Sequence, residues 1–195
     1  MIERSGTGII LFEIVMIPVA YFISSKLLIP LFIILFFTVF FFRDPAREIG
    51  EGVVSPAYGK IDFISGNRIE IFMSPFDCHV NVSPVSGKVV NINYIKGSNF
   101  PAFMRKENAE RNEIYINNED GNFKVTQIAG LFARRIVCYV REGVNVEKGQ
   151  KIGMIKFGSR AILETPPGYE FVKKIGDKVR AGETIAVKKD VQSSL

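Results

Sequence analysis

Gly158 and Ser159 form a pair whose chemistry could break the chain itself. Glycine has no Cβ, so its carbonyl carbon is open to attack by the side chain that follows it, and its backbone tolerates strain. A serine hydroxyl held against that carbonyl is a nucleophile. A Gly-Ser pair is far more often a turn, so the dipeptide alone does not decide between a turn and a self-cleaving bond.

Groups that titrate near neutral pH are scarce. His79 is the only histidine in the chain, so any proton transfer that needs an imidazole must use it. Cys78 and Cys138 have no metal-ligand spacing and suggest no disulfide framework, and we expect no metal site. The formal net charge of +5 suits an anionic partner. Charge alone does not distinguish a membrane surface, a phosphate-bearing substrate and nucleic acid.

The N-terminal residues 1–43 predict a helical hairpin in a membrane. Two apolar runs, 8–23 and 27–42, are separated by Ser24, Ser25 and Lys26. Each run is slightly shorter than the roughly 20 residues that span a bilayer comfortably. A signal peptide and a soluble amphipathic hairpin are the alternatives, but a second apolar run follows the first at once, and residues 31–37 have no polar face. Arg4, Arg43 and Arg47 flank the runs and predict that both ends are cytoplasmic.

Residues 44–195 predict a second, mainly β domain. Short segments of alternating polarity at 61–64, 68–72, 88–94 and 113–116 favour strands, and clusters of glycine, proline, serine and asparagine mark turns between them. We find no long amphipathic helix in the sequence after residue 43. A chain of this length can bury a core of its own.

An internal repeat refines the predicted fold. Residues 143–152 and 176–185 share the pattern G-x-x-V-x-x-G-x-x-I, which predicts a strand, a glycine turn and a return strand in each copy. Such paired hairpins resemble the β-sandwich, or barrel-sandwich, of lipoyl and biotinyl carrier domains. Neither copy has a lysine in the context that a carrier needs, so we interpret the repeat as structural. It would present the segment between its copies, which contains Gly158 and Ser159.

Five stretches, in order along nearly the whole chain, together resemble one family. They are residues 41–47 (FFRDPAR), 72–81 (FMSPFDCHVN) with 84–89 (PVSGKV), 110–112 (ERN), 127–130 (QIAG) with 133–137 (ARRIV), and 152–160 (IGMIKFGSR). The family is the short, archaeal and bacterial type of phosphatidylserine decarboxylase, which includes archaetidylserine decarboxylases.

The resemblance implies a carboxy-lyase that is made as a zymogen. Ser159 would attack the Gly158 carbonyl, and the chain would part into 1–158 and 159–195, with a covalent pyruvoyl group formed from Ser159 and no metal. That group would take the substrate amine and accept electrons as carbon dioxide leaves. The product would be the ethanolamine lipid. The two cleavage products would stay together as a heterodimer, and a higher oligomer remains an open alternative.

The resemblance also gives roles to single residues. His79 would be the proton donor after decarboxylation, and Asp77, two residues away on an extended strand, would orient its ring from the same face. Cys78 would point the other way and pack. Arg134, Arg135 and Arg160 are candidates to bind the lipid phosphate, because guanidinium groups match phosphate oxygens. Three further basic residues are alternatives for that role: Arg105, Lys106 and Arg111.

One position departs from the family pattern. Tyr58 stands where the family usually has an aspartate that supports the base in self-cleavage. We therefore keep an alternative function, a non-catalytic, uncleaved β-sandwich tethered to a membrane that binds lipid or a protein partner. An unmodified carrier or export-adaptor domain is a third. On the first hypothesis the partners are a phospholipid substrate and the cell membrane, without nucleic acid, and the catalytic domain faces the cytoplasm. Ester-linked and ether-linked lipid tails both remain open.

Overall fold

The computed structural model describes residues 1–97, 109–130, 136–156 and 159–189. These residues divide into two compact units, Met1–Ala46 and Arg47–Leu195.

The first unit is a helical hairpin. Helix α1 (Arg4–Ile23) and helix α2 (Leu28–Phe41) are joined by a single 3-10 turn, η1 (Ser25–Leu27). Gly6 allows a close approach at the open end, since a Cβ there would lie 2.2 Å from Cγ of Phe42. Between the helices, Thr38 Oγ1 donates a hydrogen bond to the Glu13 carboxylate at 2.8 Å. This contact provides a polar partner for a buried acidic side chain.

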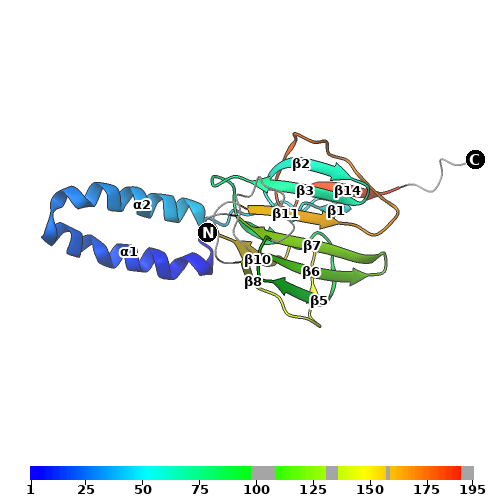
Figure 1. Cartoon of the computed structure of the whole chain (residues 1–195), viewed down its shortest axis with the longest axis horizontal. Coiled ribbons are helices and arrows are strands. Elements are labelled where there is room, and N and C mark those ends of the chain that lie inside the picture. The colour runs from blue at the N-terminus through cyan, green and yellow to red at the C-terminus, as the bar shows by residue number, and fades with distance from the viewer. Residues whose placement is uncertain (98–108, 131–135, 157–158, 190–195) are drawn as a thin grey trace, which may run out of the picture. The chain divides into compact units, whose positions relative to one another are not determined.

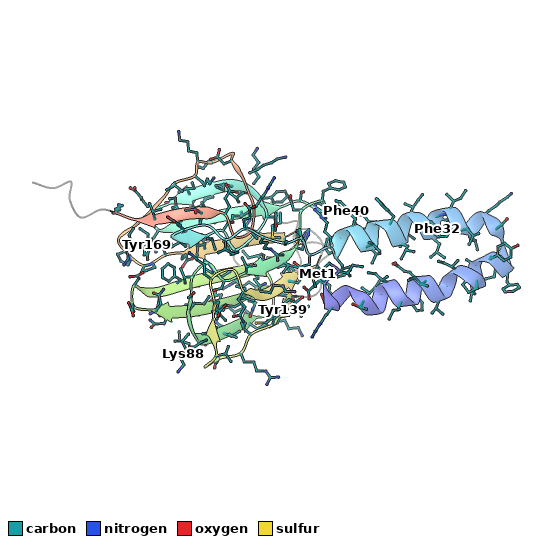
Figure 2. The ribbon with its side chains drawn as sticks, turned by 180° about the vertical axis from the view of Figure 1, so that it is seen from behind. Met1, Phe32, Phe40, Lys88, Tyr139 and Tyr169 are labelled. Atoms are coloured by element: carbon teal, nitrogen blue, oxygen red, sulfur yellow. The ribbon has the colours of Figure 1, made fainter. Side chains whose placement is uncertain are left out.

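The outer surface of the hairpin is apolar. Large hydrophobic side chains are exposed along both helices, among them Phe22, Phe32 and Phe36 at 87%, 51% and 74%. Figure 2 shows side chains projecting from both helices, with Phe32 labelled on α2. Helix α1 is long and apolar enough to cross a membrane, and α2 is shorter. Contiguous exposed apolar surface of this kind marks a surface that binds lipid or protein.

The second unit is built from strands, which confirms the prediction of a mainly β chain after the N-terminal helices. The predicted segments 61–64, 68–72, 88–94 and 113–116 lie in strands of the structure. In chain order the strands are β1 (Val53–Val54), β2 (Gly59–Ser65), β3 (Arg68–Met73), β4 (Val80–Val82), β5 (Gly87–Ile95), β6 (Arg111–Asn118), β7 (Gly121–Ala129), β8 (Ile136–Cys138), β9 (Asn145–Val146), β10 (Lys151–Ile155), β11 (Ser159–Glu164), β12 (Tyr169–Phe171), β13 (Lys178–Val179) and β14 (Thr184–Lys188).

The strands form one large sheet and two small ones. The large sheet has the order β13-β2-β3-β11-β7-β6-β5-β9, and Figure 1 shows its long central strands following one another in a curled sheet. The small sheets have the orders β1-β14-β12 and β4-β10-β8. A core of buried Ile, Val, Leu, Phe, Ala and Met side chains draws on all three sheets.

The predicted repeat is real, but the two strands of each copy join different sheets instead of pairing with each other. In the copy at 143–152, β9 pairs with β5 and β10 pairs with β4 and β8. In the copy at 176–185, β13 pairs with β2 and β14 pairs with β1 and β12. Gly149 and Gly182 make the turns, with φ of +83° and +94° that side chains with a Cβ rarely adopt.

The repeat belongs to a pseudo-two-fold symmetry that relates the described strands of the second unit. Ser83 N donates to Gln150 O and Ser55 N donates to Glu183 O, each at 2.8 Å, which are the same bonds made by equivalent residues. Val54 N likewise donates to Pro84 O, and Val82 N donates to Pro56 O. One half, the continuous half, consists of β4 to β10. The other, the split half, consists of β1 to β3 together with β11 to β14.

This symmetry explains why Ser159 lies where it does. In the continuous half, β6 and β7 are joined directly by a hairpin turn, with Asn118 paired to Gly121. The equivalent strands of the split half are β3 and β11, with Met73 paired to Ser159. There the chain leaves after Met73, builds the continuous half and returns at Ser159. Ser159 is therefore the residue at which the chain re-enters the split half from the continuous half.

Candidate active site

Ser159 begins β11 in the middle of the large sheet. It pairs with Met73 of β3 on one side and with Ala129 of β7 on the other. Its side chain is fully buried, and its Oγ donates to Met73 Sδ at 3.2 Å. A thioether is a weak acceptor, so it holds the hydroxyl in one direction without taking its proton. Gly158, the predicted partner in cleavage, lies outside the described residues.

His79 lies just before β4 and is fully buried. Its Nδ1 is 2.8 Å from the main-chain carbonyl oxygen of Asp77. A carbonyl only accepts, so Nδ1 must carry a proton, and in the neutral ring Nε2 is then the basic nitrogen. The His79 carbonyl accepts from Ile155 N at 3.2 Å, which connects the histidine to β10 shortly before the predicted cleavage site.

The structure corrects the predicted contact between Asp77 and His79. The carboxylate of Asp77 accepts from Ser74 N and Ser74 Oγ, both at 2.7 Å, and Asp77 N donates to Ser74 O. Residues 74–77 thus form a closed turn, so Asp77 does not lie on the extended strand that we predicted it to share with His79. Asp77 contacts the imidazole through its main chain, and its side chain stabilises the turn that presents that carbonyl.

Arg160 leaves β11 on the opposite face from Ser159, because successive side chains of a strand alternate. Its guanidinium is 3% exposed and forms an ion pair with Asp62 through two contacts of 2.6 and 2.7 Å. The same group contacts Glu70 at 2.6 Å. Two carboxylates therefore already pair with the guanidinium that we predicted to bind phosphate. This arrangement argues against a phosphate-binding role for Arg160. Arg134 and Arg135 lie outside the described residues.

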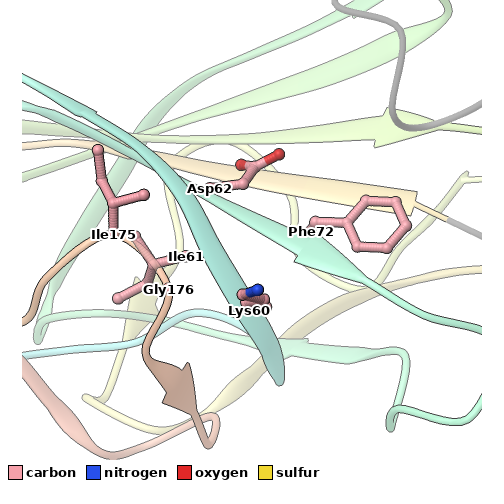
Figure 3. Close-up of a pocket in the computed structure, with 6 residues that line it drawn as sticks. All are labelled: Lys60, Ile61, Asp62, Phe72, Ile175 and Gly176. Atoms are coloured by element: carbon pink, nitrogen blue, oxygen red, sulfur yellow. The ribbon is translucent and has the colours of Figure 1, made fainter.

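A cavity of about 300 Å³ lies on the same face of the sheet as Arg160. Figure 3 shows the residues that line it. Asp62, the bidentate partner of Arg160, is one of its walls. The others are Lys60, Ile61, Phe72, Ile175 and Gly176. Phe72 pairs with Arg160 in the sheet, so the cavity and the Ser159 hydroxyl lie on different faces.

Tyr58 lies in the connection between β1 and β2 and is half-buried. The guanidinium carbon of Arg47 is 5.8 Å from the centre of its ring. Arg47 also reaches the sulfur of Cys78, with Nη2 3.7 Å from Sγ. Cys78 is buried, as the sequence predicted, and precedes His79 in the chain. Arg47 therefore contacts both Tyr58 and the segment that carries the histidine.

Sequence reasoning missed a group of buried amides beside Ser159. Asn112 Nδ2 donates to Gln127 Oε1 at 3.0 Å, and Gln127 Nε2 donates to Asn81 Oδ1 at 2.9 Å. Asn81 Nδ2 in turn lies 3.9 Å from Met73 Sδ, the atom that accepts from Ser159. Each amide lies in a stretch that carries the family resemblance. That location was the one sequence feature that could have pointed to these three residues. Among the described residues we find no cluster of His, Cys, Asp and Glu that could hold a metal ion.

The comparisons with known proteins agree on one family. The model of the family described as phosphatidylserine decarboxylase matches residues 60–187. A protein of Archaeoglobus fulgidus with the provisional name of an archaetidylserine decarboxylase proenzyme is 58% identical over 193 residues, 96% of each chain. A protein of Methanosarcina barkeri with the same provisional name is 46% identical, over 77% of this chain and 76% of its own. The phosphatidylserine decarboxylase proenzyme of Streptomyces coelicolor is 44% identical, over 75% of this chain and 70% of its own.

Proposed function

Because the chain belongs to the phosphatidylserine decarboxylase family, we propose that it matures by self-cleavage between Gly158 and Ser159 and then removes carbon dioxide from the serine headgroup of a phospholipid. It is a carboxy-lyase, and its relatives are named as proenzymes. The observation that carries the proposal is the position of Ser159. It is buried at the start of a central strand, at the junction of the two halves, with its hydroxyl held in one direction.

The proposed cleavage is balanced without any external reagent except water. Ser159 Oγ attacks the Gly158 carbonyl carbon, the C–N bond breaks, and an ester and a free amine result. Loss of the Ser159 Cα proton then expels the Gly158 carboxylate and leaves a dehydroalanine. Its enamine tautomerises to an imine, and water releases ammonia and leaves a pyruvoyl group at the new amino terminus.

The strand pairing around Ser159 would keep the two cleavage products together. β11 pairs with β3 and with β7 at six positions each, and both neighbours belong to the 1–158 piece. β13 and β14 also pair with strands of that piece. The two products would therefore remain a heterodimer held by main-chain hydrogen bonds and a shared core. When formed, the pyruvoyl group would supply an electron sink for decarboxylation.

We assign proton transfer to His79. Its Nδ1 proton is committed to the Asp77 carbonyl, so Nε2 is the atom that can take up a proton and return it. An imidazole is the side chain best suited to both accepting and donating a proton near neutral pH. Returning the proton to the carbon that has lost carbon dioxide completes the ethanolamine headgroup.

The remaining parts of the proposal concern the lipid. Arg134 and Arg135 are our candidates for its phosphate. We propose that the hairpin of α1 and α2 lies in the membrane, supported by its exposed apolar surface, with the catalytic unit on the cytoplasmic side. A serine headgroup is common to the two lipid classes in the relatives' names, and the chemistry is the same for both.

Tyr58 supports one rival, a binding protein that never cleaves. A ring contacted by Arg47 stands where the family resemblance implies an aspartate. The intact mass of the purified protein separates the two functions. Two chains, 1–158 and 159–195, the smaller with a blocked amino terminus, are expected for the enzyme. A single chain with a free Ser159, unchanged after prolonged incubation, would refute it. Ser159→Ala is the uncleaved reference for the mass.

A further inference from the structure

We propose that Asn81 is a positioning residue for self-cleavage, oriented by Gln127 and Asn112 and acting on Ser159 through Met73. The proposal rests on the proposed function, because it concerns the same bond. The three amides and Met73 would hold the Ser159 hydroxyl in place before it attacks.

The hydrogen bonds among the side-chain amides of Asn112, Gln127 and Asn81 all run in one direction, from donor to acceptor. Asn112 and Gln127 are paired across β6 and β7, and the first donates to the carbonyl oxygen of the second. The Gln127 amino group then donates to Asn81 Oδ1. All three side chains are at most 1% exposed. Because the Asn81 oxygen is held by Gln127, its amino group must point the other way, toward Met73 Sδ at 3.9 Å and Pro56 O at 3.4 Å.

Met73 is the connection between the amide chain and Ser159. A methionine side chain has three rotatable bonds and fills space without a fixed shape. Here its sulfur accepts from Ser159 Oγ at 3.2 Å and faces the amino group of Asn81. The amide therefore restrains the sulfur, and the sulfur restrains the hydroxyl. Because the sulfur is a weak acceptor, the hydroxyl loses little when it turns to attack.

The pseudo-two-fold provides an internal control for this interpretation. Asn81 of β4 pairs with Gly153 of β10, and the equivalent pair in the split half is Val53 of β1 with Ala186 of β14. The same backbone arrangement thus forms there with two apolar side chains. Burying an amide is costly unless all its hydrogen bonds are made. The fold does not require Asn81, and the polar group is present only in the half whose β4 lies beside Met73.

Gly153 makes room for the amide chain. A Cβ at this position would lie 2.6 Å from Gln127 Nε2 and 2.6 Å from the carbonyl oxygen of Val137. Any side chain would displace the Gln127 amide from Asn81. The glycine in β10 therefore leaves the space that the Gln127 amide needs to reach Asn81.

The test compares the intact wild-type chain with Asn81→Val, which copies the split half, and Met73→Leu, which keeps the volume and removes the acceptor. We expect cleavage at Gly158–Ser159 to be roughly tenfold slower or more in both, a change of about 1.4 kcal/mol in the barrier. The matched control is Asn122→Ala, which breaks the exposed Asn117–Asn122 amide pair at the other end of the same strands and should leave the rate unchanged.

Two further measurements separate positioning from structure. Thermal unfolding in a Ser159→Ala background should give Asn81→Val a midpoint roughly 4–8 °C below its reference, because an apolar residue fits the equivalent site but the buried Gln127 amino group loses its acceptor. Hydroxylamine cuts an ester but not an amide. It should therefore fail to cut the Asn81→Val precursor faster than the Ser159→Ala chain, because the variant is slow to form the ester.

The outcomes distinguish this inference from the proposed function. A wild type that never cleaves overturns both. If the wild type cleaves and Asn81→Val cleaves equally fast, only the positioning role is overturned. Rapid cutting of Asn81→Val by hydroxylamine would also overturn it, since the ester would then form without the amide. A loss of thermal stability well beyond that expected for the unpaired Gln127 amide, together with slow cleavage, would assign Asn81 to the fold instead.

Discussion

Ser159 and Arg160 are neighbours in β11, yet their side chains leave opposite faces of the sheet and serve different environments. The Ser159 hydroxyl contacts the sulfur of Met73 in the core. The Arg160 guanidinium is enclosed by Asp62 and Glu70. One strand thus carries the proposed nucleophile on one face and a buried ion-pair cluster on the other. The cluster holds β11 against β2 and β3 from the side that the chemistry does not use.

The first prediction concerns that cluster. Arg160→Ala should lower the free energy of unfolding by about 3 kcal/mol or more, because it leaves Glu70, 3% exposed, without its buried partner. Denaturant unfolding of the uncleaved Ser159→Ala chain measures this. Arg68→Ala is the matched control, since Arg68 also contacts Glu70 but is 41% exposed and should cost much less. If Arg160→Ala instead weakened only lipid binding at full stability, Arg160 would be a phosphate ligand after all.

The second prediction separates the Asp77 side chain from its main chain. Asp77→Asn keeps the carbonyl that contacts His79 and can still accept from Ser74, so kcat of matured protein should fall less than about tenfold. His79→Ala should mature poorly or, once matured, lose turnover by about 100-fold or more. Carbon dioxide release per cleaved chain is the measurement. Equal losses in the two variants would give the Asp77 carboxylate a catalytic role that the geometry does not.

Much of the fold was predictable because its signals are local. The alternating segments gave the long strands, and the two glycine-turn patterns gave the repeat. The pairing of Met73 with Ser159 was not predictable, since these residues are 86 positions apart and no local pattern encodes which strands meet. Asp77 was placed on a strand with His79 from their spacing of two residues, and that spacing does not distinguish a strand from the turn that the Asp77 carboxylate closes with Ser74. Asn81 and Gln127 were missed because a single amide carries a weak signal until its partners are brought together.

The third prediction concerns pH and the association of the two proposed pieces. Hydrogen bonds from Lys188 and then from Tyr169 hold the pKa of Asp120 below its usual value. Asp120 is in the 1–158 piece, and both donors are in the 159–195 piece (Tyr169 is labelled in Figure 2). A depressed carboxyl pKa contributes stability above the unfolded pKa of about 3.9, which is lost as pH falls through the folded value.

We therefore expect the matured protein to lose thermal stability between about pH 5 and about pH 3, and Asp120→Asn to lose less over the same interval. Midpoints of thermal unfolding across this interval measure the difference. Asp177→Asn is the control, because its contact with Lys174 N lies within the smaller piece. An identical pH dependence in wild type and Asp120→Asn would show that this contact does not hold the pieces together.

The fourth prediction concerns Tyr58. Tyr58→Asp restores the acid that the family resemblance implies and would place a carboxylate beside Arg47, whose guanidinium now lies 5.8 Å from the tyrosine ring centre. Arg47 also contacts Cys78, the residue before His79. A carboxylate in this cluster would favour the protonated imidazole and support its action as a base. We expect Tyr58→Asp to speed the appearance of the 159–195 fragment, while kcat per mature site changes little.

The measurement is a gel time course of freshly translated chains, with Tyr58→Phe and Tyr58→Asn beside the aspartate variant. Tyr58→Phe keeps a ring against Arg47 and should cleave like wild type. Tyr58→Asn matches the size of aspartate without its charge, so faster cleavage in Tyr58→Asp than in Tyr58→Asn would assign the gain to the charge. Equal rates in all four chains would make Tyr58 a neutral replacement, with another group supporting cleavage. A wild type that never cleaves, beside a Tyr58→Asp chain that does, would identify this tyrosine as the reason that the protein remains a single chain, because the nucleophile and the histidine would be shown to be competent once the acid is restored.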